Sequence, residues 1–458
     1  MNKFFSNDLP DDEFSLDGED NENINSDKWA SAFDDEFRDQ LREEYKEWAS
    51  TKKDYSITES EVKELMMDDL TFLCNMDVKE HTLYKKWEEI QTKYKDTSVK
   101  KSSSFFGYEK APSGEDLFPK LKKIKHNIWV PESIDDYQKL KPQLVITNEN
   151  SNLNGIWNIL RTFTHTQVNN TNIGRNLYFI VQDEITGKYL GVIALSSDFL
   201  DLTPRDNYIG WSRESKTGGM INHTAIGSTI CPTQPLGFNY VGGKLMALLT
   251  LSDYVENSWN RVYDTKEYPS KLVGMTTTSL YSSFSQYQNL KYWNKRGHSN
   301  GSIKFTPSKQ TMEKVGNYLQ THYPLKYWEW YVATRPSGMP LKRDFKQRSL
   351  AFLYKKLNVD KEYYETNHQR GIYFCSYYDN MKEFLKGEIE QKDLIRRKGF
   401  DNSVESLSEL WKNKYALKRI KSLEKNDRLN ISEFLFYDDL VTMTWKEAKE
   451  KYINNVGR

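Results

Sequence analysis

Residues 177–195 read LYFIVQDEITGKYLGVIAL, and this stretch decides the fold. Leu177–Val181 is rich in β-branched and aromatic residues and predicts a strand, and Tyr189–Leu195 predicts its return strand. Between them, Asp183–Lys188 carries a Thr-Gly turn signal. The stretch is therefore predicted to form a β-hairpin.

Helices and strands are predicted to alternate on both sides of this hairpin. Asn154–Thr164, before it, has apolar residues at helical spacing. After it come a predicted strand at Ala225–Cys231, a helix at residues 240–251 and a strand at Leu272–Thr277. This order predicts an α+β fold with a mixed α/β core over residues 125–305.

The segments before this core have a different composition. Residues 1–28 are mostly Asp, Glu, Asn and Ser, which bury too little apolar surface to offset the entropy of ordering, so disorder is predicted. Residues 29–96 repeat apolar side chains at intervals of three and four and predict a helical region, with a helix start at Thr58 and Glu59. Residues 97–120 mix Ser, Gly, Pro and Lys and indicate a linker.

The segment after the core, residues 306–458, is predicted to be mostly helical and basic. Gly371–Tyr378 is a short apolar run typical of a strand, whereas Met381–Leu394 and Ser403–Leu423 have helical patterns.

The basic side chains Lys414, Lys418 and Arg419 lie on the last of these helices. They belong either to a solvated surface helix or to a surface that contacts nucleic-acid phosphates, with Tyr415 stacking beside them. We include these three residues among the predicted nucleic-acid-binding residues.

Charge is distributed unevenly along the chain, although the formal net charge is zero. Residues 1–40 hold about thirteen acidic and three basic side chains, so the rest of the chain is basic by roughly ten charges. A basic body with an acidic arm fits nucleic-acid binding with a competing tail, or simply a solvating tail. Nucleic acid is the predicted partner.

Composition also excludes several classes of protein. With 37% hydrophobic and 14% aromatic residues, the 458-residue chain has ample material for a core. No long apolar run is present, and the start MNKFFSNDLPDDEF lacks the features of a signal peptide, so a cytoplasmic protein without membrane association is predicted. Cys74, Cys231 and Cys375 are far apart without C-x-x-C spacing, so neither a disulfide framework nor a metal site is predicted.

Residues 229–249, TICPTQPLGFNYVGGKLMALL, run from a predicted strand through a Pro- and Gly-containing loop into a helix. The free backbone N–H groups at such a helix start suit a pyrophosphate. Gln234-x-x-Gly237-x-Asn239 resembles the Gln/Arg-x-x-Gly-x-Gly/Ala loop with which GNAT acyltransferases hold acyl-CoA, with Asn239 standing where they have Gly or Ala. The resemblance implies that Gln234, Gly237, Asn239 and Gly242 bind acyl-CoA or a nucleotide; an ordinary strand–turn–helix is the alternative.

Residues 205–212 read RDNYIGWS and follow the return strand of the hairpin. An R-D-x-x-I-G-W-S segment after an L-x-G-V-I strand resembles the DruA family, whose members accompany the Druantia anti-phage defence system and some transposons. Tyr373–Leu385 (YFCSYYDNMKEFL) and the basic helix that follows extend the resemblance, which covers roughly residues 145–425. It implies a phage, mobile-element or defence context.

Two interpretations of the RDNYIGWS segment stay open. In one, Arg205 and Asp206 form a partly buried ion pair and Trp211 belongs to the core. In the other, all three face a cleft, where Trp211 stacks on a base and Arg205 binds phosphate. Asp206 would then be the candidate catalytic residue, a general base whose pKa burial raises.

Two classes of function are consistent with these patterns. The first is a nucleic-acid-associated, GNAT-like acyl or base-modifying transferase. The second is a non-catalytic nucleic-acid-binding or assembly component with the same fold. The loop at residues 233–244 separates them, since only the first class needs it to bind a cofactor.

Overall fold

The computed structural model describes residues 35–91, 122–164, 174–233, 236–237, 241–279, 286–299, 305–333, 345–365, 369–428 and 437–454. The chain forms two compact units, residues 1–77 with 302–367 and residues 78–301 with 368–458. The segments predicted as disordered (1–28) and as a linker (97–120) lie outside the described residues.

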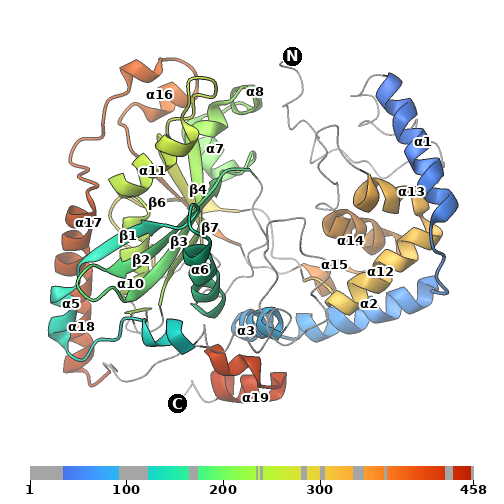
Figure 1. The fold of residues 1–458 in the computed structure, drawn as a ribbon, viewed down its shortest axis with the longest axis horizontal. Helices are drawn as coiled ribbons and strands as arrows, with labels where there is room; N and C mark the ends of the chain where they lie inside the picture. Colours follow the sequence, from blue (N-terminus) through green and yellow to red (C-terminus); the bar gives the residue numbers. More distant parts are fainter. Residues whose placement is uncertain are drawn as a thin grey trace. The chain divides into compact units, whose positions relative to one another are not determined.

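The first unit is built from helices (Figure 1). Its second helix begins where the sequence predicts, because Thr58 and Glu61 form a capping box in which each side chain accepts the other residue's backbone N–H, at 3.2 and 2.7 Å. The helices are α1 Asp35–Thr51, α2 Glu59–Cys74, α12 Lys309–His322, α13 Pro324–Tyr327, the π-helix η7 Trp328–Val332, α14 Phe345–Lys356 and α15 Lys361–Tyr364.

The second unit contains a seven-stranded sheet in the order β1-β2-β3-β4-β5-β7-β6. Neighbouring strands are antiparallel except β4 and β5, which run parallel. The strands are β1 Pro142–Ile146, β2 Asn176–Asp183, β3 Tyr189–Ser197, β4 Thr224–Pro232, β5 Gly274–Thr278, β6 Asn294–His298 and β7 Gly371–Ser376. The predicted hairpin is confirmed as β2–β3, and the other three predicted strands as β4, β5 and β7.

The β2–β3 hairpin sends alternate side chains into two hydrophobic cores. Phe179 and Ile193 pack on the face that α10 and α11 cover, whereas Ile180 and Val192 pack on the face that α6 covers (Figure 1). Trp157 of α6 also donates its Nε1–H to the Ile193 carbonyl at 3.1 Å. Burial on both faces explains why these strands read as nearly continuous apolar runs.

Helices of the second unit include α3 Val78–Ile90, α5 Ile134–Lys139, α6 Ser151–Thr164, α7 Thr203–Ile209, α8 Arg213–Thr217, η6 Met220–His223, α10 Gly242–Leu249, α11 Asp253–Tyr263 and α16 Met381–Leu385. They continue with η9 Gln391–Asp393, α17 Val404–Trp411, η10 Lys412–Ala416, α18 Leu417–Lys425, η11 Tyr437–Val441, α19 Trp445–Lys449 and η12 Glu450–Asn454. In the described part of the chain, none of the helices has the length and apolar character needed to cross a bilayer.

Three features differ from the sequence-based expectation. The helix predicted over Met381–Leu394 ends at Leu385, because Gly387 adopts φ +79° and turns the chain away. Strands β1 and β6 were not predicted. The predicted region 306–458 is divided between the two units, since β7 pairs with β5 and β6 and brings the residues after 367 into the sheet unit.

Two glycine substitutions test this packing. A Cβ on Gly155 of α6 would meet nothing within 4 Å, so Gly155→Ala should stabilise the chain by about 0.5–1 kcal/mol through helix propensity. A Cβ on Gly274 of β5 would lie 2.3 Å from Phe374 Cζ, so Gly274→Ala should destabilise it. Urea unfolding measures both; equal effects of the two changes would contradict the packing of β5 against β7.

Candidate functional site around the RDNYIGWS segment

The RDNYIGWS segment lies on α7 and the turn that follows it, between β3 and β4. Gly210 ends the helix with φ +83°, a conformation that favours glycine. The backbone N–H groups of Gly210 and Trp211 both donate to the Asp206 carbonyl, at 2.8 and 3.0 Å. The segment therefore forms one short helix closed by a tight turn.

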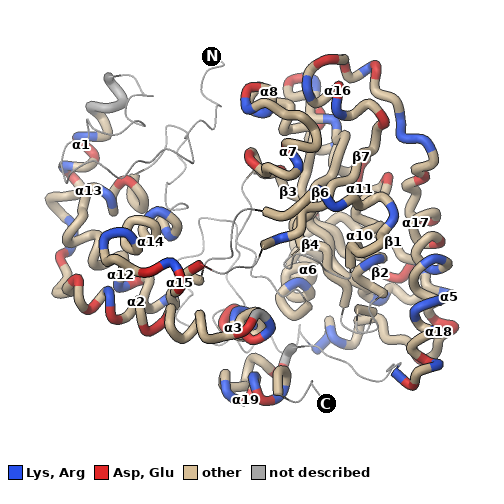
Figure 2. The backbone as a smooth tube through the Cα atoms, turned by 180° about the vertical axis from the view of Figure 1, so that it is seen from behind, with Lys and Arg blue, Asp and Glu red and all other residues tan. Residues whose placement is uncertain are grey.

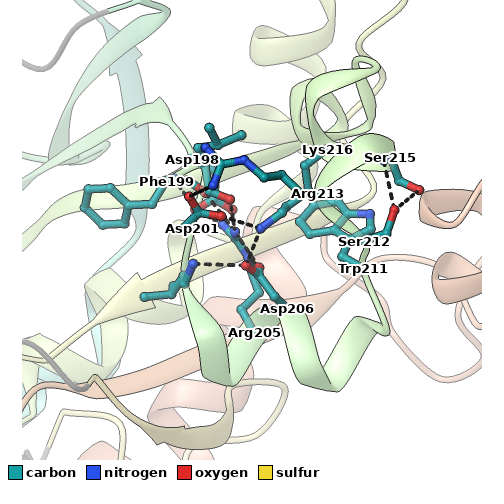
Figure 3. A network of polar contacts seen from close by, with 12 residues as sticks. Asp198, Phe199, Asp201, Arg205, Asp206, Trp211, Ser212, Arg213, Ser215 and Lys216 are labelled. Atoms are coloured by element: carbon teal, nitrogen blue, oxygen red, sulfur yellow. Dashed lines mark hydrogen bonds and ion pairs between the residues drawn. The ribbon is translucent and has the colours of Figure 1, made fainter. Parts of the chain in front are cut away.

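Arg205 is fully buried and lies at the centre of a charge network (Figure 3). Its Nε donates to Asp206 Oδ1 at 2.8 Å, and its Nη2 donates to the Phe199 carbonyl at 2.7 Å. Its Nη1 lies 2.8 Å from Asp198 Oδ1, in ion-pair contact but not aligned for a hydrogen bond. Asp198 accepts a hydrogen bond from Thr276 Oγ1 of β5 at 2.7 Å. The network thus ties α7 to the end of β3 and to β5.

Asp206 has both carboxylate oxygens engaged. Oδ1 receives Arg205 Nε and lies 2.6 Å from Arg205 Nη2, while Oδ2 receives Lys216 Nζ at 2.7 Å and the Leu202 backbone N–H at 3.0 Å. Three of these groups donate hydrogen bonds to the carboxylate, and Arg205 Nη2 adds an ion-pair contact. A general base must present a free lone pair to its substrate, whereas Asp206 is buried and three of its roughly four lone-pair sites already accept hydrogen bonds. The geometry matches the buried ion pair, and the catalytic role stays a prediction.

Lys216 of α8 closes the network on its solvent side. Its ammonium donates to Asp201 Oδ1 and to Asp206 Oδ2, each at 2.7 Å. The hydrogen bond from Lys216 holds the pKa of Asp201 below its usual value. Arg213 lies 4.0 Å from the other oxygen of Asp201. Three carboxylates therefore face three cations. Asp198, Arg205, Asp206 and Lys216 are buried, so their charges need partners, whereas Asp201 and Arg213 are exposed.

Trp211 is partly buried and packs against the main core. Its Nε1–H donates to the Leu385 carbonyl of α16 at 2.7 Å, and its ring centroid lies 5.1 Å from the Arg205 guanidinium. The side chain thus connects the α7 turn to α16. Arg205 and Trp211, both predicted to bind nucleic acid, contact each other and the protein interior, and their binding role stays a prediction.

Tyr208, in the middle of the same segment, has a different environment. Two cations approach its ring: Arg296 of β6, with Cζ 3.4 Å from the ring centroid, and Lys382 of α16, with Nζ 3.9 Å from it. The ring also contacts Phe374 of β7 at a centroid distance of 5.9 Å. Sequence reasoning did not connect Tyr208 with Arg296 and Lys382, because only the sheet and α16 bring these three residues together.

The predicted cofactor loop is described only in part, since Gln234 and Asn239 lie outside the described residues. Gly237 and Gly242 are both close-packed: an added Cβ would lie 2.9 Å from Pro232 Cγ at Gly237 and 2.7 Å from Leu236 Cγ at Gly242. Lys244, in the first turn of α10, donates to the Gln288 carbonyl at 2.5 Å, and burial lowers its pKa to about 8.

The charge network around Arg205 and the predicted cofactor loop lie at opposite ends of β4. The network reaches β5 at Thr276, which pairs with Ile226 in the first half of β4, whereas the loop follows the other end of β4 after Pro232. Ile226 and Pro232 are six residue steps apart along the strand, or about 20 Å at the usual rise per residue. Asp206 is therefore remote from any ligand that the loop would hold by its backbone.

The predicted basic surface lies on η10 and α18. Lys414 and Lys418 are exposed, and Arg419 is half-buried. The Tyr415 hydroxyl donates to the Asn289 carbonyl at 3.1 Å and accepts the Lys291 N–H at 2.9 Å, while Lys414 Nζ lies 5.5 Å from the Tyr415 ring centroid. Tyr415 thus anchors the helix to the sheet unit, and the two lysines point outward.

Sequence reasoning missed the partners of Arg205 that follow β3. Asp198 and Asp201 are the first two acidic residues after the strand, and Lys216 is ten residues beyond Asp206. Their closeness in sequence to an Arg-Asp pair was the available signal. Within the described ranges, no cluster of three or more His, Cys, Asp or Glu side chains could hold a metal ion.

A seven-stranded mixed sheet with helices on both faces and a buried charge network at α7 defines a mixed α/β protein. The family model described as Druantia protein DruA matches residues 108–387, more than half of the chain, and the chain belongs to this family. It is 33% identical over 125 residues to the Druantia protein DruA of Escherichia coli (strain UMEA 4076-1). That alignment covers 26% of this chain and 30% of the relative's length. No solved structure matches.

Replacing Asp206 tests whether the network is structural. Asp206→Asn leaves Arg205 and Lys216 without a shared buried counter-charge, so the free energy of unfolding should fall by about 3–5 kcal/mol. Urea unfolding at pH 7 measures this loss, with Asp135→Asn as a control because Asp135 is exposed. A variant as stable as the unmodified chain would contradict the structural role and favour the general-base interpretation.

Proposed function

We propose that this DruA-family chain is a nucleic-acid-associated protein of an anti-phage defence or mobile-element system, with a GNAT-like core that binds acyl-CoA or a nucleotide. The sheet topology is the observation that carries the proposal. The expected helix, hairpin, strand, helix and strand occur in the expected order as α6, β2–β3, β4, α10 and β5, with α7, α8 and η6 inserted between β3 and β4 and α11 between α10 and β5.

The relation between β4 and β5 supports a ligand site at this end of the sheet. The two strands pair in parallel only from Thr224 to Gly227 of β4, while β4 continues to Pro232. Among the described residues, its second half therefore pairs with a strand, β3, on one side only, and on the other side Gln286 Nε2 donates to the Ile230 carbonyl at 3.1 Å. Unpaired backbone groups of a strand edge can bind an extended, amide-containing ligand, and the α10 N-terminus suits its phosphates.

The alternative is a non-catalytic nucleic-acid-binding or assembly component with the same fold. The burial of Asp206 favours it, because three hydrogen bonds and the contact with Arg205 Nη2 already surround the predicted general base. Under this alternative the loop before α10 is an ordinary strand–turn–helix connection. The two functions differ in whether the loop binds a ligand.

Titration calorimetry with acetyl-CoA and with ATP separates the two. Gly237 is a poor position to vary, because its Cβ would clash with Pro232, whereas a Cβ on Gly243 would lie 3.3 Å from the buried Gln286 side chain. Gly243→Val should weaken binding at least tenfold, about 1.4 kcal/mol, by adding bulk to the first turn of α10. Urea unfolding of the ligand-free variant is measured beside it, because Gln286 donates to the Ile230 carbonyl and must shift.

The matched control is Gly155→Val on α6, where an added Cβ meets nothing within 4 Å. It introduces the same residue into a helix and should leave the affinity within about twofold, an energy difference of roughly 0.4 kcal/mol. If neither acetyl-CoA nor ATP binds the unmodified chain, the cofactor proposal fails and the non-catalytic alternative becomes the better one.

A further inference from the structure

A β-bulge in the edge strand β6 directs the Arg296 side chain toward Tyr208. β6 pairs with β7 through Lys295 and Gly297, and the register shifts between them, so Arg296 is the extra residue of a β-bulge. A bulge re-aims the side chain that it carries. Gly297 has φ +143°, and a Cβ there would lie 3.2 Å from Pro204 of α7, so the bulge and α7 are in close contact.

The two cations on Tyr208 differ from the other cations near α7 in their partners. Arg205 and Lys216 each contact a carboxylate. In the described part of the chain, by contrast, no Asp or Glu lies within ion-pair distance of Arg296 or Lys382, and neither side chain donates a hydrogen bond to a protein acceptor. The Arg296 Nε is buried without a hydrogen-bond partner.

The positive charge of the Arg296 guanidinium has no carboxylate partner among the described residues, which makes its partial burial unfavourable. Burial lowers the pKa of Arg296, and the charge of Arg397 adds to this effect. A half-buried guanidinium with unused donors and a second cation nearby is an environment that an anion would stabilise. Figure 2 shows basic residues in blue on both β6 and α16, the elements that supply the two side chains.

We infer that Arg296 and Lys382, held on the ring of Tyr208, contact the phosphate backbone of a nucleic acid. This inference rests on the proposed association with nucleic acid and names a site for it. Guanidinium and ammonium groups are the side chains that bind phosphate. Since both cations already lie against the Tyr208 ring, the ring serves to position them and not to stack on a base. The contact is therefore expected to be independent of base sequence.

The buried network provides the rigidity that such a site needs. Tyr208 is two residues from Asp206 on the same short helix, so the network that fixes α7 also fixes the ring on which both cations lie. Side chains that are held in place before binding lose less conformational entropy when the ligand arrives.

The experiment measures the affinity of the full chain for a 30-nucleotide single-stranded DNA and a duplex of equal length by fluorescence anisotropy, over a salt series. The double variant Arg296→Gln/Lys382→Gln should bind at least fivefold more weakly at low salt. The slope of log affinity against log salt should fall by about 0.7–0.9 for each phosphate contact removed. If the double variant loses stability, Lys382→Gln alone replaces it, because Lys382 does not belong to the hydrophobic core. The single variant should change the salt slope by about half as much.

The matched control is Lys63→Gln/Lys266→Gln, which removes the same charge at two exposed positions. It should leave the salt slope unchanged. A double variant at Arg296 and Lys382 with the affinity and slope of the unmodified chain overturns the inference, and so does displacement of the DNA by inorganic phosphate at an equal phosphate concentration. Loss of binding only in Lys414→Gln/Lys418→Gln also overturns it and places the contact on α18 and η10. If the unmodified chain binds no DNA at all, the proposed association with nucleic acid fails as well.

Discussion

The guanidinium of Arg205 has no access to water, so its charge is compensated entirely by groups of the protein. Asp198 and Asp206 supply the negative charge, and the Phe199 carbonyl supplies a further acceptor. Removal of either carboxylate would leave the network with more cations than carboxylates, and an uncompensated buried charge costs far more than an exposed ion pair contributes. The end of β3, α7 and β5 are therefore held in one arrangement, because only that arrangement brings these groups together.

Several other features depend on this arrangement. With α7 fixed, Tyr208 lies over Phe374 of β7, and the bulge of β6 brings Arg296 onto the same ring. The RDNYIGWS segment thus has two roles. Its charged pair faces the interior, while its tyrosine contacts two cations that have no carboxylate partner among the described residues. The predicted cofactor loop lies at the opposite end of β4, so a cofactor and the proposed phosphate contact would be bound on separate parts of the sheet unit.

Local sequence patterns predicted the centre of the fold well. The β2–β3 hairpin, α6, β4, α10, β5 and β7 have strong apolar periods or runs, because both faces of the central strands are buried. The capping box at Thr58 identified the start of α2. Strand β6 was missed because Asn294–His298 (NKRGH) is a polar edge strand that forms by pairing with β7, a partner more than seventy residues away.

The candidate site was predicted only in part, because its contacts, like the pairing of β6, depend on residues far apart in the sequence. Arg205, Asp206 and Trp211 were identified as a unit, but sequence alone could not decide which way they face, since an ion pair in a core and one in a cleft use the same residue types. The contact of Arg296 and Lys382 with Tyr208 depends on long-range pairing, so no local pattern indicates it.

The most direct test of the central claim is native-state hydrogen exchange of the α7 turn. The amide hydrogens of Gly210 and Trp211 are bonded to the Asp206 carbonyl, inside the region that the Arg205 network fixes. If the network holds α7 as a structural element, these amides exchange only with the slowest, global opening of the sheet unit, together with those of β3 and β4. Exchange as fast as that of exposed loop amides, with β3 and β4 still protected, would contradict the account and show that α7 opens independently.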